Sequence, residues 1–370
     1  MRMELILYFY GAVCVCMILF NICYTLSLRR RAPRMARRMK KLAKVTRGHL
    51  ALLAGGQQRL PPGEAARLSR LLGRRWNLMA FYRLLQQGFQ GQEAARDAYL
   101  AQLQPVFLSL AMGYLRREPM QASYFVYVLA QCWPPRLTAT EALQQVLLDY
   151  LRKDNLYCRL NTMKALCRFG SPAYLVQAVQ IQDDGVLVTH EKLVTETLLT
   201  YTGDHQQLIA ALWDRLDRFT PHTQLAVLNY IRFRSGQWCR QMLALLVQED
   251  RDKETRLAAI RYFGRYPYPP ALDHLLAFAR DRTPERWAYA TVAVAALARY
   301  PEPRVVNTLK QALHSGNWYI RSAAAQSLDE QHAEYHQLLD IMAGNDRYAR
   351  EMITYHLQIR QLRQEEARPE

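Results

Sequence analysis

The chain has 370 residues, half of them hydrophobic, and a formal net charge of +17. This length and hydrophobic content allow a sizeable folded core and exclude a wholly disordered chain. Glycine and proline number only 16 each, helix formers such as leucine, alanine, glutamine and arginine recur throughout, and no Asn-Gly or Asp-Gly turn is flanked by alternating Val, Ile or Thr runs. The composition therefore predicts an all-α fold.

The positive charge is concentrated at the N-terminus. Residues 1–50 hold eleven Lys or Arg and a single acid, Glu4, which accounts for +10 of the +17. The remaining 320 residues carry only +7, an ordinary value for a soluble body. Because a nucleic-acid-binding protein places its basic residues along a binding face of the folded domain, this local excess argues against a nucleic-acid partner.

The first strongly patterned segment is apolar. Leu5 to Leu28 contains no charged residue, and these 24 residues would span roughly 36 Å as a helix, enough to cross a hydrocarbon core of about 30 Å. Tyrosines lie near both ends, as interfacial aromatic residues do. A cleavable signal peptide would have a shorter apolar run and a small-residue cleavage site, whereas Arg29-Arg30-Arg31 follows here at once. Residues 1–31 are therefore predicted to form a transmembrane anchor.

The basic residues beside this segment predict its orientation. Ten basic residues follow the apolar run and one precedes it, so the positive-inside rule places the N-terminus outside and the large body in the cytoplasm. The chain is thus expected to be a single-pass protein of the cell membrane. Asn21, the one strongly polar side chain in the run, lies either near the interface or against a partner helix in the membrane.

Residues 32–58 are expected to form a basic linker. Met35, Met39, Leu42 and Val45 recur at three- and four-residue spacing, which predicts an amphipathic helix lying on the membrane surface. A solvated helix that only enforces topology would use the same charges. The basic residues expected to contact anionic lipid head groups are Arg29, Arg30, Arg31, Arg34, Arg37, Arg38, Lys40, Lys41 and Lys44. Gly55-Gly56 is predicted to be a flexible hinge between this linker and the rest of the chain.

The body contains a sequence repeat. The segments 157–166, 254–263 and 319–328 each have a basic residue, a small or apolar residue three positions later and a large apolar residue seven positions later. We call the helices predicted for these segments, and for weaker copies, signature helices. Their equivalent positions are 159, 192, 224, 256, 290, 321 and 350. A period near 32 residues matches two helices joined by short turns, and a second apolar helix follows the signature helix, as at 173–181, 271–279 and 305–313.

The copy at 320–328, Ile-Arg-Ser-Ala-Ala-Ala-Gln-Ser-Leu, resembles the first helix of a short bacterial HEAT repeat. The resemblance implies an all-α fold in which helix pairs stack into a HEAT-like α-solenoid over residues 151–361, and it suggests a bacterial source. It also implies that an acid before each signature arginine links neighbouring repeats, as in the pairs Asp154–Arg159, Asp281–Arg286 and Asp346–Arg350.

The segment 59–150 is predicted to be helical but divergent from the repeat, and 362–370 to be a polar tail. The candidate helices of the divergent part are 63–73, 75–87, 94–117, 120–132 and 138–153. Glycines near the ends of signature helices are expected to act as C-caps, at Gly170, Gly203, Gly236 and Gly264.

Few residues carry a pattern of known chemistry. The chain has no P-loop, no G-x-S-x-G and no G-x-G-x-x-G. His332 and His336 share one face of a predicted helix but lack a third metal ligand, so surface histidines are the simpler interpretation, and no metal site is expected. The seven cysteines have no metal-binding spacing and are expected to be free thiols.

The predicted function is a membrane-anchored, non-enzymatic scaffold that binds a protein partner. The resemblance implies protein binding in the solenoid groove, lined by the second helices, and the partner would be a membrane protein or a recruited soluble protein. Neither a cofactor nor a small-molecule substrate is expected. Candidate partner-binding residues are Asn21, Trp213, Trp238, Trp287 and Trp318. Two alternatives remain open: HEAT-like proteins that bind nucleic acid, and HEAT-like enzymes that attach bilin chromophores to cysteines.

Overall fold

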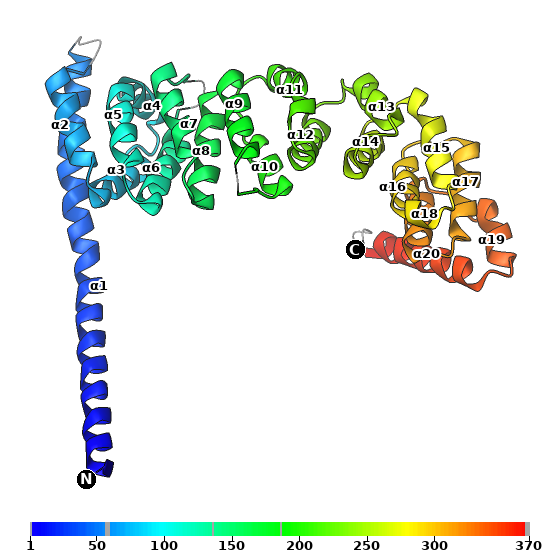
Figure 1. The fold of residues 1–370 in the computed structure, drawn as a ribbon, viewed down its shortest axis with the longest axis horizontal. Helices are drawn as coiled ribbons and strands as arrows, with labels where there is room; N and C mark the ends of the chain where they lie inside the picture. The colour runs from blue at the N-terminus through cyan, green and yellow to red at the C-terminus, as the bar shows by residue number, and fades with distance from the viewer. Residues whose placement is uncertain (1, 56–59, 135–136, 186, 367–370) are drawn as a thin grey trace. The chain divides into compact units, whose positions relative to one another are not determined.

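The computed structural model describes residues 2–55, 60–134, 137–185 and 187–366, and every regular element within these ranges is a helix (Figure 1). The chain forms two compact units. Unit 1 comprises Met1–Val188 with Thr200–Asp204, and unit 2 comprises Thr189–Leu199 with His205–Glu370. The predicted all-α class is confirmed for the described residues.

Unit 1 contains nine helices in the part of the chain that the structure describes. They are α1 (Arg2–Ala54), α2 (Pro62–Leu72), α3 (Arg75–Gln87), α4 (Glu93–Gln102), α5 (Gln104–Leu115), α6 (Pro119–Cys132), α7 (Glu141–Tyr150), α8 (Leu156–Phe169) and α9 (Pro172–Asp183). One row of contacts runs through α1, α3, α6 and α8, and a second row runs through α2, α5, α7 and α9. Helices in these rows therefore pack on non-consecutive neighbours, whereas α4 contacts the next helix, α5.

Unit 2 contains one such continuous row of contacts. Its α-helices are α10 (Glu191–Leu198), α11 (His205–Trp213), α12 (Pro221–Arg234), α13 (Cys239–Val247), α14 (Lys253–Arg265), α15 (Leu272–Arg280), α16 (Trp287–Leu297), α17 (Pro303–Leu313), α18 (Trp318–Glu330), α19 (Leu339–Ala343) and α20 (Arg347–Glu366). Short 3-10 helices are η1 (Leu216–Arg218), η2 (Pro269–Ala271), η3 (Pro284–Arg286) and η4 (Tyr335–Leu338). The signature helices α10, α12, α14, α16, α18 and α20 each pack on the next one in this series.

Local capping explains where several helices begin. The side chain of Asn155 accepts a hydrogen bond from the Cys158 amide at 2.9 Å, and Asp252 and Asn317 cap α14 and α18 in the same way. These contacts satisfy amides that the helix itself leaves unpaired. Of the predicted C-cap glycines, Gly170 has the left-handed conformation, with φ 73°.

The other three predicted C-cap glycines do not have positive φ, so the prediction is wrong for them. Gly264 lies inside α14, where a Cβ atom would come within 3.2 Å of the Ala296 Cα on α16. Glycine here serves the close approach of two packed helices, not a turn.

The signature arginines bind backbone carbonyl groups more than acids. The Arg159 guanidinium donates to the Leu187 carbonyl oxygen at 2.7 Å, Arg256 to that of Leu246 at 3.1 Å, and Arg321 to that of Ser315 at 2.7 Å. Of the three expected acid pairs, only Asp281–Arg286 forms, at 3.3 Å, and it joins residues of one connection.

The other two expected pairs are absent from the described ion pairs, and Asp346 instead contacts His314 at 2.7 Å. A loop carbonyl is held in place by the fold and carries no net charge. Buried arginines such as Arg159 and Arg256 can therefore be hydrogen-bonded without the free-energy cost of burying a carboxylate as well.

The N-terminal helix is continuous from Arg2 to Ala54, with Pro33 inside it. Its segment Tyr8–Thr25 is long and apolar enough to cross a membrane and is fully exposed in the structure. Farther along, Met35, Leu42, Thr46 and His49 are buried, and α1 packs on α3, with His49 contacting Glu64 of α2 and Tyr99 of α4.

This packing corrects the prediction of a separate helix on the membrane surface. The apolar stripe that begins at Met35 contacts protein, because α3 offers it a complementary apolar face that the sequence pattern alone does not reveal. Of the predicted hinge, Gly55 follows α1 and Gly56 lies outside the described residues.

Candidate interaction surfaces

Most of the predicted site residues on α1 whose side chains the structure describes are exposed. The Asn21 amide donates to the Met17 carbonyl oxygen of its own helix at 3.0 Å. Arg34, Arg37, Lys40, Lys41 and Lys44 are exposed, and Arg38 is half-buried. The side chains of Arg29, Arg30 and Arg31 lie outside the described residues. The described basic side chains therefore remain accessible beside a stripe that is itself covered by protein.

The four predicted tryptophans fall into two classes. Trp213 on α11 and Trp238 before α13 pack against each other, with ring centroids 5.1 Å apart, and both are half-buried. Trp287 and Trp318 begin the signature helices α16 and α18, and their side chains are 41% and 55% exposed. The exposed tryptophans thus belong to signature helices, whereas the sequence analysis assigned the binding groove to the second helices.

An aromatic patch forms around the exposed tryptophans of unit 2. Trp287 stacks on Tyr319 at a centroid distance of 5.5 Å, and Trp318 meets Tyr319 edge-on at 5.3 Å. Trp287 and Asn317 also line a cavity of about 490 Å³. We call Trp287, Trp318 and Tyr319 the unit 2 aromatic patch. Sequence reasoning missed Tyr319, although it directly follows Trp318.

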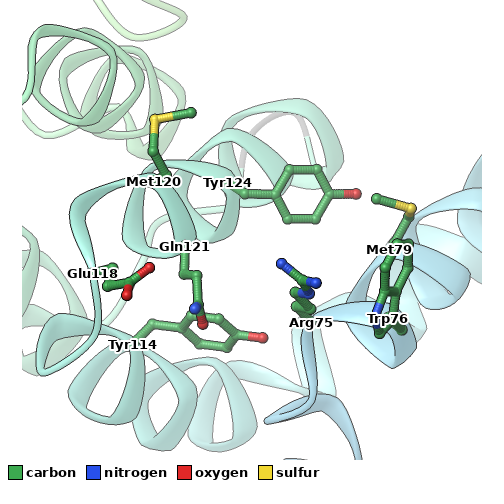
Figure 2. A pocket seen from close by; sticks show the side chains of 8 residues that line it. All are labelled: Arg75, Trp76, Met79, Tyr114, Glu118, Met120, Gln121 and Tyr124. Atoms are coloured by element: carbon green, nitrogen blue, oxygen red, sulfur yellow. The ribbon is translucent and has the colours of Figure 1, made fainter. Parts of the chain in front are cut away.

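Unit 1 has a second aromatic site, which sequence reasoning missed entirely. A cavity of about 380 Å³ lies between the starts of α3 and α6 and the end of α5 (Figure 2). It is lined by Arg75, Trp76, Met79, Tyr114, Glu118, Met120, Gln121 and Tyr124. In the sequence, the signal for this site is the recurrence of aromatic and basic residues at helix starts. These residues form one site only because α3 and α6 pack against each other.

Aromatic rings and arginines are interleaved at this cavity. The Arg75 guanidinium carbon lies 4.9 Å from the Trp76 ring centroid, and that of Arg117 lies 4.1 Å from the Tyr114 ring centroid. The Tyr114 hydroxyl donates to the Leu72 carbonyl oxygen at 3.1 Å. Burial raises the pKa of Tyr124 to about 12, so its hydroxyl is protonated at neutral pH and can act as a hydrogen-bond donor.

A basic patch lies on α12 and α14 of unit 2. Arg232 and Arg265 approach the ring of the exposed Phe233, at 4.7 and 5.4 Å from its centroid. Burial lowers the pKa of Arg232, and the neighbouring charges of Arg261 and Arg265 lower it further. These arginines lie on signature helices, whereas the nucleic-acid alternative called for a basic cluster on the second helices.

No cluster of three or more His, Cys, Asp or Glu suited to a metal ion occurs among the described residues. The two histidines considered in the sequence do not share a helix face: His332 follows the end of α18 with φ 54°, and His336 lies in η4, where it contacts Glu334 at 2.9 Å. The helix prediction failed because the chain turns at 331–334. Burial raises the pKa of the Cys158 and Cys167 thiols to about 11 and 12, which keeps them protonated and unreactive.

The side chains described above are apolar, aromatic and basic, and they form surfaces suited to binding. The two aromatic sites belong to different units, one on the starts of α3 and α6 and one on the starts of α16 and α18. Comparison with known proteins finds no protein-family model that matches the chain and no matching curated protein.

Proposed function

We propose that this protein is a scaffold held at the inner face of a membrane, in which a HEAT-like α-solenoid of helix pairs binds a protein partner. The observation that carries the proposal is the division of α1 into two halves. One half is apolar and exposed from Tyr8 to Thr25, and the other half buries one face, which includes Met35, Leu42 and His49, against the helical body. An uninterrupted helix links a segment that is long and apolar enough to span a membrane to a folded domain.

The exposed half of α1 supports insertion into a bilayer. Its exposed large side chains are Tyr8, Phe9, Tyr10, Val13, Val15, Met17, Ile18, Leu19, Phe20, Ile22 and Tyr24. Soluble proteins rarely expose a contiguous apolar surface of more than a few hundred Å². A helix in lipid satisfies its own backbone hydrogen bonds, so a bilayer accommodates this segment without unpaired polar groups.

The proposed orientation rests on the charges that flank the apolar segment. Replacing Arg29, Arg30 and Arg31 with glutamate is expected to reduce the fraction of molecules whose C-terminus is cytoplasmic, because these charges follow the span directly. Protease protection of a C-terminal tag in intact cells measures this fraction. The matched control replaces the exposed Arg215, Arg218 and Arg240 of unit 2 with glutamate. Unchanged C-terminal exposure in the first variant would refute the orientation.

The binding role rests on the unit 2 aromatic patch. Exposed tryptophan and tyrosine side chains supply large contact areas at little entropic cost and dominate many protein interfaces. The experiment is purification of the full-length protein from its own membranes in mild detergent, followed by identification of bound proteins. We expect a stoichiometric protein partner, whose yield falls at least roughly tenfold when Trp287, Trp318 and Tyr319 are all replaced with alanine.

The matched control replaces three other exposed tyrosines, Tyr335, Tyr348 and Tyr355, with alanine and should retain the partner. Bound nucleic acid in place of a protein, or equal loss of the partner in both variants, would count against the proposed binding role.

A further inference from the structure

One end of unit 1 carries two adjacent turns that are rich in arginine. The α2–α3 turn and the α5–α6 turn are joined by the hydrogen bond from the Tyr114 hydroxyl to the Leu72 carbonyl oxygen, 3.1 Å long. A Cβ atom built on Gly73 would lie 3.7 Å from the Arg117 guanidinium. We call the group Arg70, Arg74, Arg75, Trp76, Arg116 and Arg117 the anchor-side face. These residues come from two segments, 70–76 and 116–117, which the fold brings together.

The α2–α3 turn lies at the end of unit 1 from which the N-terminal half of α1 extends (Figure 1). At the opposite end of the unit, His49 of α1 contacts Tyr99 at 3.0 Å and Glu64 at 3.4 Å, so α2 begins beside the C-terminal part of α1. From there α2 runs back toward the N-terminal half of α1 and ends at the α2–α3 turn. The turn is therefore nearer than the rest of α2 to the proposed membrane span.

The distance between the body and the bilayer follows from α1. Burial of α1 begins at Met35, which is 8% exposed and lies seven residues beyond Leu28. At the α-helical rise these seven residues correspond to about 10 Å. The polar head-group layer on each side of a bilayer is about 5–8 Å thick. If the span ends near Leu28, the end of unit 1 lies just outside the head-group layer, and long arginine side chains reach back to the phosphates.

The charge of the anchor-side face is unbalanced. Its five arginines form no ion pair with any described acid, and Glu118 is the single acid of the two turns. Some other arginines in the described chain are paired, such as Arg96 with Asp97 at 2.9 Å. Near the next turn, α7–α8, Arg152 and Lys153 are balanced in charge by Asp149 and Asp154. The two turns of the anchor-side face thus carry a basic excess that the α7–α8 turn lacks.

The cavity of Figure 2 opens among these residues. Arg75 lines it together with Trp76, and Met120 at its edge is 64% exposed. Guanidinium groups bind phosphate with paired hydrogen bonds, and tryptophan favours the boundary between head groups and acyl chains. The arginine therefore suits the head-group phosphate of a lipid, and the tryptophan and the exposed methionine suit its acyl chains.

We propose that the anchor-side face is a second membrane-contacting surface, which binds the phosphates of anionic lipids and holds unit 1 against the bilayer. This inference rests on the proposed membrane anchoring and adds the lipid class and the residues that contact it. Each engaged arginine should strengthen the contact roughly fivefold at low salt, and the effect should weaken as salt screens the charges.

The test is hydrogen exchange of the full-length protein in nanodiscs made of phosphatidylcholine alone or mixed with phosphatidylglycerol. We expect slower amide exchange at 70–76 and 116–120 in the anionic discs and equal exchange at the α3–α4 turn, 88–92, at the other end of the unit. Replacing Arg70, Arg74, Arg75 and Arg116 with glutamine should abolish the difference. Replacing four other exposed basic residues, Lys164, Arg215, Arg218 and Arg240, should preserve it.

Two results would overturn the inference. Equal exchange in both lipids, with the protein inserted in the discs, would remove the second surface and leave the anchored scaffold standing. Failure of the protein to enter either disc would remove both proposals, because the span itself would then be absent.

Discussion

Replacing Ala324 with aspartate is expected to destabilise unit 2 by about 3–5 kcal/mol. Ala324 is fully buried in α18, which packs on α16, α17 and α20. The carboxylate would be charged without a partner in an apolar interface, or would be protonated at a cost in free energy. The helices on both sides should separate locally, so that α18 unfolds at lower urea concentration. Pulse proteolysis of the full-length protein in detergent measures the urea midpoint.

The control for this substitution is Gln326→Asp, two residues along the same helix on an exposed position. It introduces the same charged residue on the surface. Because it removes only the exposed hydrogen bond from Gln326 to Glu330, it should change the free energy of unfolding by less than about 1 kcal/mol. An equal midpoint for the two variants would contradict the packing of α18 described above.

Replacing both Val15 and Ile18 with arginine is expected to move the protein from the membrane to the soluble fraction. Both side chains lie in the apolar exposed half of α1. An arginine at the centre of a membrane span costs about 2.5–3.5 kcal/mol by insertion measurements, so the pair should cost about 5–7 kcal/mol. The protein remaining in carbonate-washed membranes measures the loss.

The matched control places the two arginines at Ala51 and Leu52, in the part of α1 that follows the buried segment, where both positions are exposed. This variant should stay in the membrane fraction. Retention of the Val15 and Ile18 variant at the same level would mean that the apolar half of α1 does not hold the protein in a bilayer.

Helix positions were largely predictable because their signals are local. The segment predicted at 75–87 is α3, and the signature segment 319–328 lies within α18. One predicted helix, 94–117, is divided at Leu103 into α4 and α5, with Pro105 in the first turn of α5. Proline at that position favours the start of a helix and disfavours the continuation of a preceding one. This signal is present in the sequence, but the continuous apolar pattern led to the prediction of a single helix.

The candidate sites were less predictable because they depend on distant contacts. Four tryptophans have similar sequence settings, yet Trp213 and Trp238 cover each other whereas Trp287 and Trp318 remain exposed. The four tryptophans differ in exposure because the neighbouring helices place different side chains beside them. The cavity lined by Arg75 and Tyr124 could not be foreseen either, because its walls come from helices separated by more than 30 residues.

The helical class, the uncharged segment from Leu5 to Leu28 and the excess of basic residues that follows it can all be derived from the sequence, since each depends on composition and spacing along one chain. Three other features depend on packing and needed the folded structure: the burial of the stripe that begins at Met35, the hydrogen bond of Arg256 to a loop carbonyl, and the gathering of five arginines on the anchor-side face. Residues with similar sequence settings differ in their contacts, because burial and hydrogen bonding depend on which helices pack next to each other.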